Sequence, residues 1–418
     1  MKNIIQVLTE RGLVDAKTSE DINLLADKPL SVYVGFDPTS DSLHLGNLMG
    51  IMVLAWFQRF GHKPFALVGG ATGMIGDPSG KSVERNLLDT KSLSHNLEGI
   101  SQSLKAVLKE NVTIVNNYDW FKGVDFIDFL RDVGKHFRVS AMLAKDSVKT
   151  RLASEEGISY TEFSYQLLQA YDFLYLYDTH QVVLQMGGSD QWGNITAGTE
   201  LVRKMRGASV HGLTFPLLTR SDGKKFGKSE EGAIWLNHDK LPPYDFYQYL
   251  YRIGDADVPK MMRMLTFMDI EEIKQIEAQM QSEGYVPNSA QKRLAEEITR
   301  IVHGEVGLED ALRVTEAAKP GSHTVLDKTT MHALVSELPN KKLPRHHVVE
   351  VKYIDLLVHA KILPSKSEAR RMISGGGIYL NNEKVEDENL IILNEHLIEN
   401  EFLLVGIGKK KKVVIQLI

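Results

Sequence analysis

The sequence predicts an α/β protein in which a parallel sheet covered by helices is followed by a helical domain and a small α+β domain. Three observations predict this order: short apolar runs alternate with helical patterns in the first half, helical patterns alone follow, and both kinds mix after about residue 345. A chain of 418 residues is also too long for one hydrophobic core, so two or three domains are expected.

The first half begins with MKNIIQVLTERGLVD, which predicts an amphipathic helix. Charged residues interrupt its apolar positions, whereas a signal peptide has an uninterrupted apolar segment. Short apolar runs bounded by glycine or polar residues then predict strands over residues 30–36, 65–70, 112–117 and 182–188. Longer periodic segments separate the runs, so the strands are expected to be parallel. Ligands of such sheets bind beyond the carboxyl ends of the strands, where small or polar residues follow each run.

The second half changes character near residue 242. Leu294, Ile298 and Val302 share one helical face, and Gly304 is expected to end that helix. Residues 321–344 are rich in Pro, Gly, Ser and Lys and predict a mobile linker. The end of the chain combines a helix in SKSEARRMISGG with strand-like runs in GIYLNN and KKVVIQLI. The expected domains are therefore 1–220, 221–320 and 345–418.

The composition excludes several kinds of chemistry. There is no cysteine, which removes disulfides, thiolate catalysis and cysteine-bound zinc. None of the 14 histidines lies in an H-E-x-x-H pattern, the pair His346-His347 is expected to point to opposite sides of any regular element, and no protein metal site is expected. No stretch has the roughly twenty apolar residues of a membrane span, so we expect a cytoplasmic protein without membrane contact.

Basic residues gather near the end of a chain whose net charge is −5. From Lys341 onward there are 13 Lys and Arg against 10 Asp and Glu, and the basic residues cluster at Lys361 to Arg371 and at Lys409 to Lys412. Such a patch fits either a polyanionic partner or a solvated basic surface, and charge alone leaves both open.

The stretch GGATGMIGDPSGKS, residues 69–82, is close to a phosphate-binding loop but is not one. The phosphate-loop pattern requires a glycine five places before the glycine of Gly-Lys-Ser, and that position is Ile75. Any nucleotide bound at this stretch is bound by another geometry.

Two other stretches point to phosphate chemistry. In YVGFDPTSDSLHLGN, residues 33–47, Gly46 allows close approach of a ring or ribose, and His44 can donate to a phosphate beside a helix start. A helix start capped by Ser42 or Asp41 is the simpler alternative. In DGKKFGKSEEG, residues 222–232, Lys224, Lys225 and Lys228 share a glycine-rich loop that suits a triphosphate or a solvated turn.

Together these stretches resemble the signatures of class I aminoacyl-tRNA synthetases. His44-Leu45-Gly46-Asn47 matches His-Ile-Gly-His at its first and third positions, and Lys225-Phe226-Gly227-Lys228-Ser229 matches Lys-Met-Ser-Lys-Ser at both lysines and the final serine. GFDPTSDSLHLGN, ALVGGATGMIGDPSGKS, FLRDVGKHF, TEFSYQLLQAYDF and GGSDQWGNITAG resemble the bacterial-type tyrosyl-tRNA synthetases, in that family's order and over nearly the whole chain. Asn47 replaces the second histidine, and Val34 stands where relatives often have cysteine.

The resemblance implies a Rossmann-like catalytic domain, an α-helical anticodon-side domain and a C-terminal RNA-binding domain like that of ribosomal protein S-four. It implies that L-tyrosine is activated with ATP to tyrosyl-adenylate and then passed to the terminal adenosine of tRNA(Tyr). Mg²⁺ is expected with ATP, without a dedicated protein site. A homodimer is also implied, with one tRNA spanning both subunits and contacts near FLRDVGKHF and Tyr160.

The site residues implied by the resemblance fall into three groups. In the tyrosine site Tyr33 and Asp172 pair with the phenol and Asp77 anchors the ammonium, and the full set is Tyr33, Asp77, Tyr165, Gln169, Asp172 and Gln191. The implied ATP residues are Gly35, Asp37, Thr39, His44, Gly46, Asn47, Gly187, Asp190, Lys225 and Lys228, and the implied catalytic residues are Thr39, His44, Asn47, Lys81, Arg85, Lys225 and Lys228. RNA phosphates are assigned to Lys366, Arg370 and Arg371, with the Lys409 to Lys412 run alongside.

Three alternative functions remain. Tryptophanyl-tRNA synthetase shares both signatures and the fold, but lacks the C-terminal domain and the TEFSYQLLQAYDF stretch. A synthetase-like protein that serves only in RNA binding or splicing would not need His44, Lys225 and Lys228. A nucleotidyltransferase for a small cofactor also uses a histidine-glycine signature but has no need of a tRNA-type domain.

Overall fold

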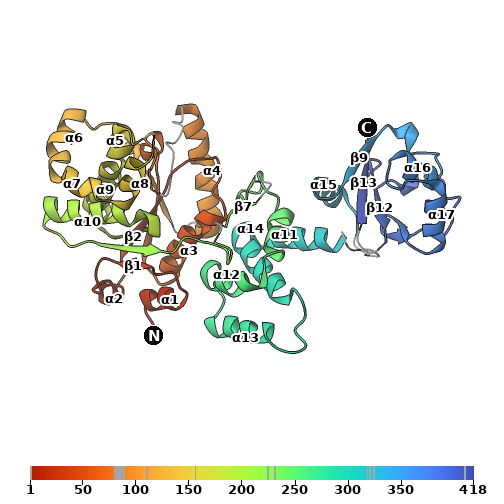
Figure 1. Ribbon diagram of the computed structural model, residues 1–418, viewed down its shortest axis with the longest axis horizontal. Helices are drawn as coiled ribbons and strands as arrows, with labels where there is room; N and C mark the ends of the chain where they lie inside the picture. Colours follow the sequence, from red (N-terminus) through yellow and green to blue (C-terminus); the bar gives the residue numbers. More distant parts are fainter. Residues whose placement is uncertain are drawn as a thin grey trace. The chain divides into compact units, whose positions relative to one another are not determined.

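The computed structural model (Figure 1) describes residues 2–79, 90–109, 112–155, 157–223, 226–229, 232–317, 319, 322, 325–408 and 411–418. The chain forms two compact units. One comprises Met1–Leu241 and Leu250–Val302, and the other comprises Pro242–Tyr249 and His303–Ile418. Within the described residues, no helix has the length and apolar character needed to cross a membrane.

The first unit contains a six-stranded sheet with the strand order β1-β6-β5-β2-β3-β4. The four expected strands are β2 (Ser31–Phe36), β3 (Lys63–Val68), β4 (Thr113–Asn116) and β5 (Val182–Gly188), and their pairings are parallel as predicted. The sequence does not predict β6 (His211–Phe215), which is parallel to β5, or the short β1 (Ala16–Lys17), which is antiparallel to β6. The predicted α/β class is therefore confirmed.

The strand order reverses between β2 and β5. From β2 the chain proceeds to β3 and β4 on one side, and it returns to form β5 and β6 on the other. The connections that follow β2 and β5 therefore lead away from each other, which opens a crevice at the carboxyl ends of these two strands. The topology itself places a ligand site there.

Helices cover both faces of this sheet. The connections β2–α3–β3 and β5–α10–β6 run in opposite directions along the sheet, so right-handed crossovers place α3 (Leu45–Arg59) and α10 (Trp192–Arg206) on opposite faces. Helix α9 (Tyr160–His180) packs beside α10, and its Phe173 joins Tyr33 and Phe65 of the sheet in one core. The other helices of this part are α1 (Ile4–Glu10), α2 (Ile22–Leu25), α4 (Thr90–Leu108), α5 (Tyr118–Phe121), α6 (Phe126–Asp132), α7 (Val139–Leu143) and α8 (Asp146–Leu152).

The predicted helical segment is confirmed. It contains α11 (Pro243–Tyr251), α12 (Val258–Leu265), α13 (Ile270–Met280) and α14 (Ser289–Ala317). The range of α14 comprises two helices that meet at Gly304, where the backbone leaves the helical region with φ of +73°. A positive φ is readily available only to glycine, and Gly304 ends the first of the two helices as predicted.

The end of the chain forms a five-stranded sheet in the order β11-β10-β12-β13-β9. Its strands are β9 (Asn340–Leu343), β10 (Ile378–Leu380), β11 (Glu383–Lys384), β12 (Phe402–Ile407) and β13 (Lys411–Leu417). Helices α16 (Tyr353–His359) and α17 (Lys366–Ser374) share a core with β10, β12 and β13. The expected α+β character of this segment is confirmed.

The linker expected over residues 321–344 is wrong for most of its length. Helix α15 (Lys328–Glu337) and strand β9 lie inside it, and β9 pairs with β13 as part of the C-terminal sheet. Met331 and Leu334 of α15 pack with Val314 of α14 and Phe402 of β12. The composition misled because the core partners of this helix are distant in the sequence.

The run Lys409 to Lys412 does not form a uniformly exposed basic surface. Lys409 and Lys410 lie outside the described residues, whereas Lys412 is only 5% exposed. Its ammonium donates to the backbone oxygens of Ala317 (2.9 Å) and Lys319 (2.8 Å) and to the side-chain oxygen of Asn382. Lys412 therefore binds carbonyl groups at the end of α14 and is not available to RNA, contrary to the sequence-based expectation.

Candidate active site

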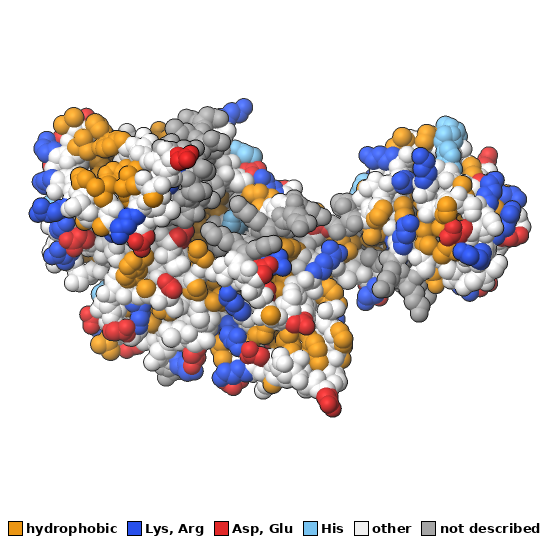
Figure 2. Space-filling model, in the orientation of Figure 1, with side chains coloured by type: hydrophobic (Ala, Val, Ile, Leu, Met, Phe, Trp, Pro, Cys, Tyr) orange, Lys and Arg blue, Asp and Glu red, His pale blue; other side chains and the backbone are white. Residues whose placement is uncertain are grey.

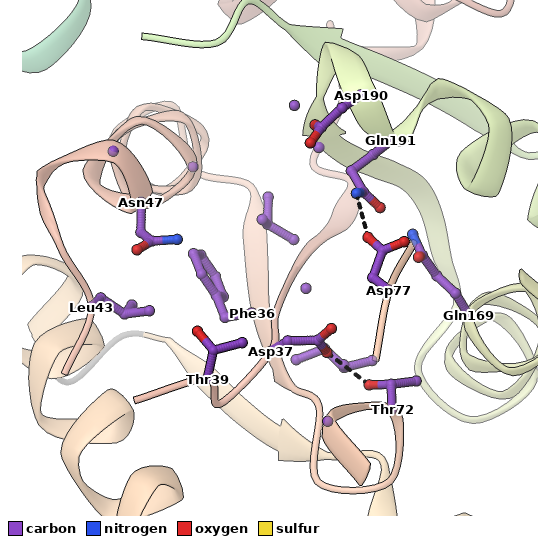
Figure 3. Close-up of a pocket in the computed structure, with 18 of the residues that line it drawn as sticks. Phe36, Asp37, Thr39, Leu43, Asn47, Thr72, Asp77, Gln169, Asp190 and Gln191 are labelled. Carbon is purple, nitrogen blue, oxygen red and sulfur yellow. Dashed lines mark hydrogen bonds between the residues drawn. The ribbon is translucent and has the colours of Figure 1, made fainter. Parts of the chain in front are cut away.

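A cavity of about 730 Å³ lies at the carboxyl ends of β2 and β5, where the topology places a ligand. Its walls come from these two strands, the start of α3, α9 and the segment after β3 (Figure 3). The cavity brings together Tyr33, Gly35, Asp37, Thr39, His44, Gly46, Asn47, Asp77, Tyr165, Gln169, Asp172, Gly187, Asp190 and Gln191. They include every residue of the expected tyrosine and ATP sites for which the structure describes a side chain or a glycine backbone.

Asp172 of α9 supplies a buried carboxyl group to this cavity. It is 2% exposed and accepts hydrogen bonds from Asn117 Nδ2 (3.1 Å) and Trp120 Nε1 (2.9 Å). Burial raises the pKa of Asp172 well above its usual range, and the two donors oppose that shift. The result is a buried carboxyl group whose orientation is fixed from both sides.

Tyr33 supplies a hydroxyl group to the same cavity. Its side chain is 1% exposed, and in the part of the chain that the structure describes its hydroxyl has no hydrogen-bond partner. Burial and the charge of Asp172 raise the pKa of Tyr33, so the hydroxyl keeps its proton. Because a buried hydroxyl without a partner is costly, Tyr33 and Asp172 together suit a ligand that both donates and accepts hydrogen bonds.

Two further carboxylates line the cavity nearby. Asp77 accepts from Gln191 Nε2 (2.7 Å), and Asp37 accepts from the hydroxyls of Tyr165 (2.8 Å) and Thr72 (2.9 Å). Figure 3 shows Gln191 directed at Asp77 and Asp37 directed at Thr72. Burial is the main cause of a raised pKa at Tyr165, and Asp37 and Asp77 add to it. This negatively charged wall suits an ammonium group.

His44 caps the start of α3, so the alternative in which Ser42 or Asp41 caps it is wrong. Its Nδ1 accepts from the Gly46 backbone N–H (3.0 Å), and its own backbone N–H donates to Asn47 Oδ1 (3.1 Å). A neutral imidazole that accepts through Nδ1 carries its proton on Nε2, which is therefore the donor. A side chain at Gly46 would lie 2.9 Å from the His44 ring, so only glycine fits.

The two signature stretches lie against each other. Leu45 N–H donates to Ile234 O (2.8 Å), and the backbones of His44 and Trp235 form an isolated antiparallel β-bridge. Gly227 has φ of +91°, and a side chain there would lie 2.9 Å from the Gly46 nitrogen. The glycine between the two lysines of the second signature thus packs directly on the first signature.

Some expected residues cannot be placed. Lys81, Arg85, Lys224 and Lys225 lie outside the described residues. Lys228 begins the two-residue strand β7 (Lys228–Ser229), which pairs with β8 (Gly232–Ala233), but its side chain is not described. In the described part of the chain, no cluster of three His, Asp or Glu side chains could hold a metal ion.

Sequence reasoning missed Asn117 and Trp120, the two donors to Asp172. Asn117 directly follows β4, so the rule that places ligands at the carboxyl ends of strands could have found it. Trp120 lies 52 residues from Asp172 in the sequence, and no local pattern connects them.

The basic helix α17 is exposed in the second unit. Lys366, Arg370 and Arg371 have side chains between 54% and 80% exposed, and acidic residues lie near each of them. The separations are 2.9 Å for Lys366 to Asp355, 3.8 Å for Arg370 to Glu388 and 3.9 Å for Arg371 to Glu368. Exposed pairs of this kind are weak and can be exchanged for phosphate.

The histidines of the C-terminal segment are closer together than expected. The rings of His346 and His347 lie 4.2 Å apart, and the ring of His347 lies 4.7 Å from that of His359. The prediction that the pair points to opposite sides is therefore wrong, because both residues lie in a short 3-10 helix, Arg345–His347.

Comparisons with known proteins agree with the geometry. A family model described as tRNA synthetases class I (W and Y) matches residues 25–318, and one described as the Tyrosine--tRNA ligase SYY-like C-terminal domain matches residues 331–415. The tyrosine--tRNA ligase of Protochlamydia amoebophila is 59% identical over 422 residues, which cover 100% of this chain and 99% of that one. The enzyme of that name from Bacillus caldotenax is 46% identical and covers 99% of each chain.

A solved structure shows the same relationship. The C-terminally truncated mitochondrial tyrosyl-tRNA synthetase of Aspergillus nidulans has a TM-score of 0.67 and 29% sequence identity, and covers 74% of this chain and 92% of that one. A tryptophanyl-tRNA synthetase from Encephalitozoon cuniculi, at 14% identity and a TM-score of 0.55, shares the fold. Since a family model matches more than half of the chain and close relatives match its whole length, the chain belongs to the tyrosine--tRNA ligase family of class I tRNA synthetases.

Proposed function

We propose that this chain activates L-tyrosine with ATP to form tyrosyl-adenylate and pyrophosphate, and then transfers the tyrosyl group to the terminal adenosine of tRNA(Tyr). The observation that carries this proposal is the pair formed by Tyr33 and Asp172, a buried hydroxyl and a buried carboxyl group in one cavity. The cavity is also large enough for an amino acid together with a nucleotide.

The phenol of tyrosine matches this pair. Its O–H donates to the Asp172 carboxylate, and its oxygen accepts from the Tyr33 hydroxyl. Phenylalanine would leave both buried groups without partners, which is the physical basis of strong rejection, and tyrosyl-tRNA synthetases are a known example of it. Asn117 and Trp120 hold the carboxylate in the orientation that the phenol requires.

The amino group of tyrosine is assigned to the acidic wall. Asp77 faces the ammonium, and Gln191 orients Asp77 by donating to it. Gln169 lines the same wall, and its side-chain oxygen is buried without a hydrogen-bond partner among the described residues, so it can accept from the ammonium. Tyr165, fixed by its bond to Asp37, completes the amino-acid site.

ATP is assigned to the part of the cavity between the first signature and β5. Gly35, Gly46 and Gly187 allow the backbone to approach the adenine and ribose, and Asp190 can accept from ribose hydroxyls. The phosphates of ATP are assigned to the neighbouring part of the cavity, which is lined by Asp37, Thr39, His44 and Asn47. Mg²⁺ enters with ATP as part of the substrate, and no protein ligands are assigned to it.

Activation requires no covalent bond to the enzyme. A carboxylate oxygen of tyrosine attacks the α-phosphorus of ATP, the bond from that phosphorus to the pyrophosphate oxygen breaks, and pyrophosphate leaves with the added negative charge. Thr39, the Nε2–H of His44, Asn47, Lys81, Arg85, Lys225 and Lys228 are proposed to stabilise that charge. Catalysis is therefore electrostatic, with donors directed to where charge develops.

In the second step, a ribose hydroxyl of the terminal adenosine attacks the tyrosyl carbonyl carbon, and AMP leaves. We assign residues 1–220 to tyrosine and ATP binding, 221–320 to the lysine loop and the anticodon-side helices, and 345–418 to RNA binding. The exposed Lys366, Arg370 and Arg371 of α17 are the proposed phosphate contacts. We place the enzyme in the cytoplasm, where it would meet its tRNA.

Amino-acid-dependent exchange of labelled pyrophosphate into ATP tests the function. Tyrosine should support exchange, and tryptophan and phenylalanine should not do so at the same concentration. Exchange with tryptophan would assign the chain to the tryptophan branch. Absence of exchange with every amino acid, together with retained tRNA binding, would indicate an RNA-binding protein without synthetase activity.

We also propose a homodimer through an apolar surface on the first unit. Phe126, Ile127, Val139 and Tyr160 are between 62% and 67% exposed, at the starts of α6, α7 and α9. Figure 2 shows hydrophobic side chains gathered over α6 and α7. Exposed apolar clusters of this kind are typical of subunit interfaces, and a second copy of the chain is the occupant that the family resemblance favours.

Sedimentation tests the dimer. Phe126→Asp together with Ile127→Asp should yield monomers at concentrations at which the unmodified protein is dimeric. The control is Leu24→Asp, which changes a side chain that is 75% exposed outside the apolar surface. If the unmodified protein sediments as a monomer, the dimer proposal is wrong.

A further inference from the structure

The side chain of Asn237 connects three segments of the first unit that are far apart in the sequence. Its Nδ2 donates to the backbone oxygens of Asp41 (3.3 Å) and Gly99 (3.0 Å), and its Oδ1 accepts from the hydroxyl of Ser103 (2.6 Å). The carboxamide thus uses both N–H donors and its oxygen, each toward a different residue. Gly99 and Ser103 belong to α4, and Asp41 belongs to the loop before His44.

Other hydrogen bonds close the same junction. The backbone N–H of Asn237 donates to the Ser42 hydroxyl (3.2 Å), and that of Leu43 donates to the Ser103 hydroxyl (3.2 Å). Leu236 N–H donates to Leu43 O (2.8 Å). Ser103 is fully buried and Ser42 is 3% exposed, so water cannot readily replace these bonds.

The two backbones that Asn237 connects are in direct contact. A side chain at Gly99 would lie 1.8 Å from the Asp41 oxygen, so α4 can approach this loop only because residue 99 is glycine. A junction with no space between the backbones transmits small displacements from one segment to the next. The position of α4 and the position of the loop are therefore fixed together.

Each of the three segments adjoins proposed phosphate-binding groups. The loop at Asp41 leads into His44, residue 237 follows the lysine loop of residues 222–232, and α4 follows residues 80–89, which carry Lys81 and Arg85 in the sequence. Asn237 is not among the described residues that line the cavity, and it is uncharged. Any effect of Asn237 on the reaction must therefore act through the segments that it holds.

We propose that Asn237 is a positioning residue for tyrosine activation, which sets the loop of His44, the exit of the lysine loop and α4 in one arrangement. The inference depends on the proposed roles of His44 and the lysines. Groups that stabilise developing charge must be held within a fraction of an ångström, and misplacement by about 1 Å can cost roughly 10²-fold in rate. Tyr33, Asp77 and Asp172 are not contacted by the Asn237 side chain, so tyrosine binding is not expected to depend on it.

The test is pre-steady-state formation of tyrosyl-adenylate with separate titrations of ATP and tyrosine. Asn237→Ala should lower the rate at saturating ATP by about 10- to 100-fold, with the tyrosine dissociation constant changed less than twofold. Asn237→Asp should be at least as slow, because it keeps the acceptor for Ser103 but directs a carboxylate oxygen at two backbone oxygens. Ser103→Ala removes one of the three side-chain bonds of Asn237 together with the acceptor of the Leu43 N–H, and should give a smaller loss of the same kind.

Gln58→Ala is the matched control. Gln58 is also a carboxamide that holds α4, but it donates to Leu108 O (3.0 Å) at the far end of that helix. The Gln58→Ala variant should have a lower melting temperature and an unchanged rate of adenylate formation. If Asn237→Ala and Ser103→Ala behave like Gln58→Ala, the junction is only structural and the inference is wrong.

A double variant separates this inference from the proposed function. If Asn237 acts through the loop of His44, then His44→Ala combined with Asn237→Ala should lose less rate than the product of the two single losses. Independent, multiplicative losses would contradict the inference. Full rates for His44→Ala and Lys228→Ala would instead overturn the proposed roles of those residues. If Asn237→Ala does not fold, Ser103→Ala alone decides, and the absence of a selective rate loss would overturn the inference.

Discussion

The indole Nε1 of Trp120 donates a 2.9 Å hydrogen bond to Oδ1 of Asp172. Asn117 donates to the other carboxylate oxygen at 3.1 Å, so each oxygen of this buried group has one fixed donor. A carboxylate oxygen can accept more than one hydrogen bond, which leaves capacity for the phenol of the substrate. The two donors determine the direction from which the phenol must approach.

Asp172→Asn should chiefly weaken tyrosine binding. The substituted amide offers no charge to the phenol, and its NH₂ group replaces one of the two oxygens and so faces the donor of either Trp120 or Asn117. Loss of a hydrogen bond to a charged group costs about 1.5–3 kcal/mol, or roughly 10- to 150-fold in affinity. Calorimetric titration with tyrosine measures the loss, and the selectivity over phenylalanine should fall in pyrophosphate exchange. Unchanged affinity in a correctly folded Asp172→Asn would remove this residue from phenol recognition.

Tyrosine affinity should fall as the pH is lowered. Burial raises the pKa of Asp172 in the free enzyme, and the phenol donates only to the ionised form. Protonation of Asp172 therefore competes with tyrosine binding, and the loss should begin at a pH well above the usual value of 3.8 for this side chain. Titrations across the acidic range on the unmodified protein and on Asp172→Asn test this, because the variant should lack the dependence. An identical pH profile in both proteins would assign the loss to another group.

The fold was predictable where local pattern and tertiary environment agree. Short apolar runs correctly located β2, β3 and β5 because the inner strands of a parallel sheet are largely buried. Such a run also located β4, an edge strand in which no residue is buried. The strand β6 was missed because HGLTF has no distinctive alternation, although all of its residues are buried. Helix α15 was missed because its core partners Val314 and Phe402 are brought to it only by the tertiary fold.

The same distinction applies to the site. Residues within continuous motifs, such as His44 and Asp77, could be assigned from the resemblance, and the structure brings them into one cavity. Trp120, Asn237 and Lys412 form hydrogen bonds with residues that lie 52, 138 and 95 positions away in the sequence, respectively. No local periodicity encodes such contacts. Lys412 also shows that a charge run predicts exposure poorly when carbonyl groups at a helix end can bind one of its members.

Lys228→Ala should slow adenylate formation by at least about 10²-fold, because it removes a donor to the developing charge on pyrophosphate. Tyrosine binding should change little, since the proposed contacts of tyrosine lie on Tyr33, Asp77 and Asp172. Stopped-flow measurement over a tyrosine titration resolves the rate and the dissociation constant separately. A variant that keeps the full rate at saturating ATP would exclude Lys228 from the mechanism.

Arg370→Ala together with Arg371→Ala should weaken tRNA charging and flatten its salt dependence. Each lost phosphate contact removes roughly one released counterion, so the slope of log affinity against log salt should become shallower. Tyrosyl-adenylate formation should be unchanged, because α17 lies in the second unit, whereas all the cavity residues lie in the first. Lys274→Ala, which removes an exposed charge from α13, is a control for net charge. Equal losses in both half-reactions would show that these arginines serve folding.

Lys412→Met should loosen the C-terminal sheet from the end of α14. The ammonium of Lys412 binds Ala317 O, Lys319 O and the side-chain oxygen of Asn382. Its removal takes this donor from Lys319 O and from Asn382, at a cost of about 1–3 kcal/mol, whereas Ala317 O keeps the Nδ2 of Asn382 as a donor (3.1 Å). Limited proteolysis near residue 319 should be faster in Lys412→Met than in the unmodified protein. The control is Lys411→Met, since Lys411 is exposed on the same strand.

The contribution of Lys412 to the free energy of unfolding should also rise with pH. Burial lowers its pKa from 10.5 to about 8, so between these values the unfolded chain binds the proton and the folded protein largely does not. Stability rises with pH wherever the unfolded state binds more protons, so the unmodified protein should gain stability relative to Lys412→Met as the pH rises from about 8 toward 10.5. Calorimetric unfolding of both proteins at several pH values in this window measures the difference between their free energies of unfolding. The titration of other groups affects both proteins equally and cancels from this difference. A constant difference across the window would show that Lys412 keeps its usual pKa despite its burial, and that its three oxygen partners offset the cost of desolvation.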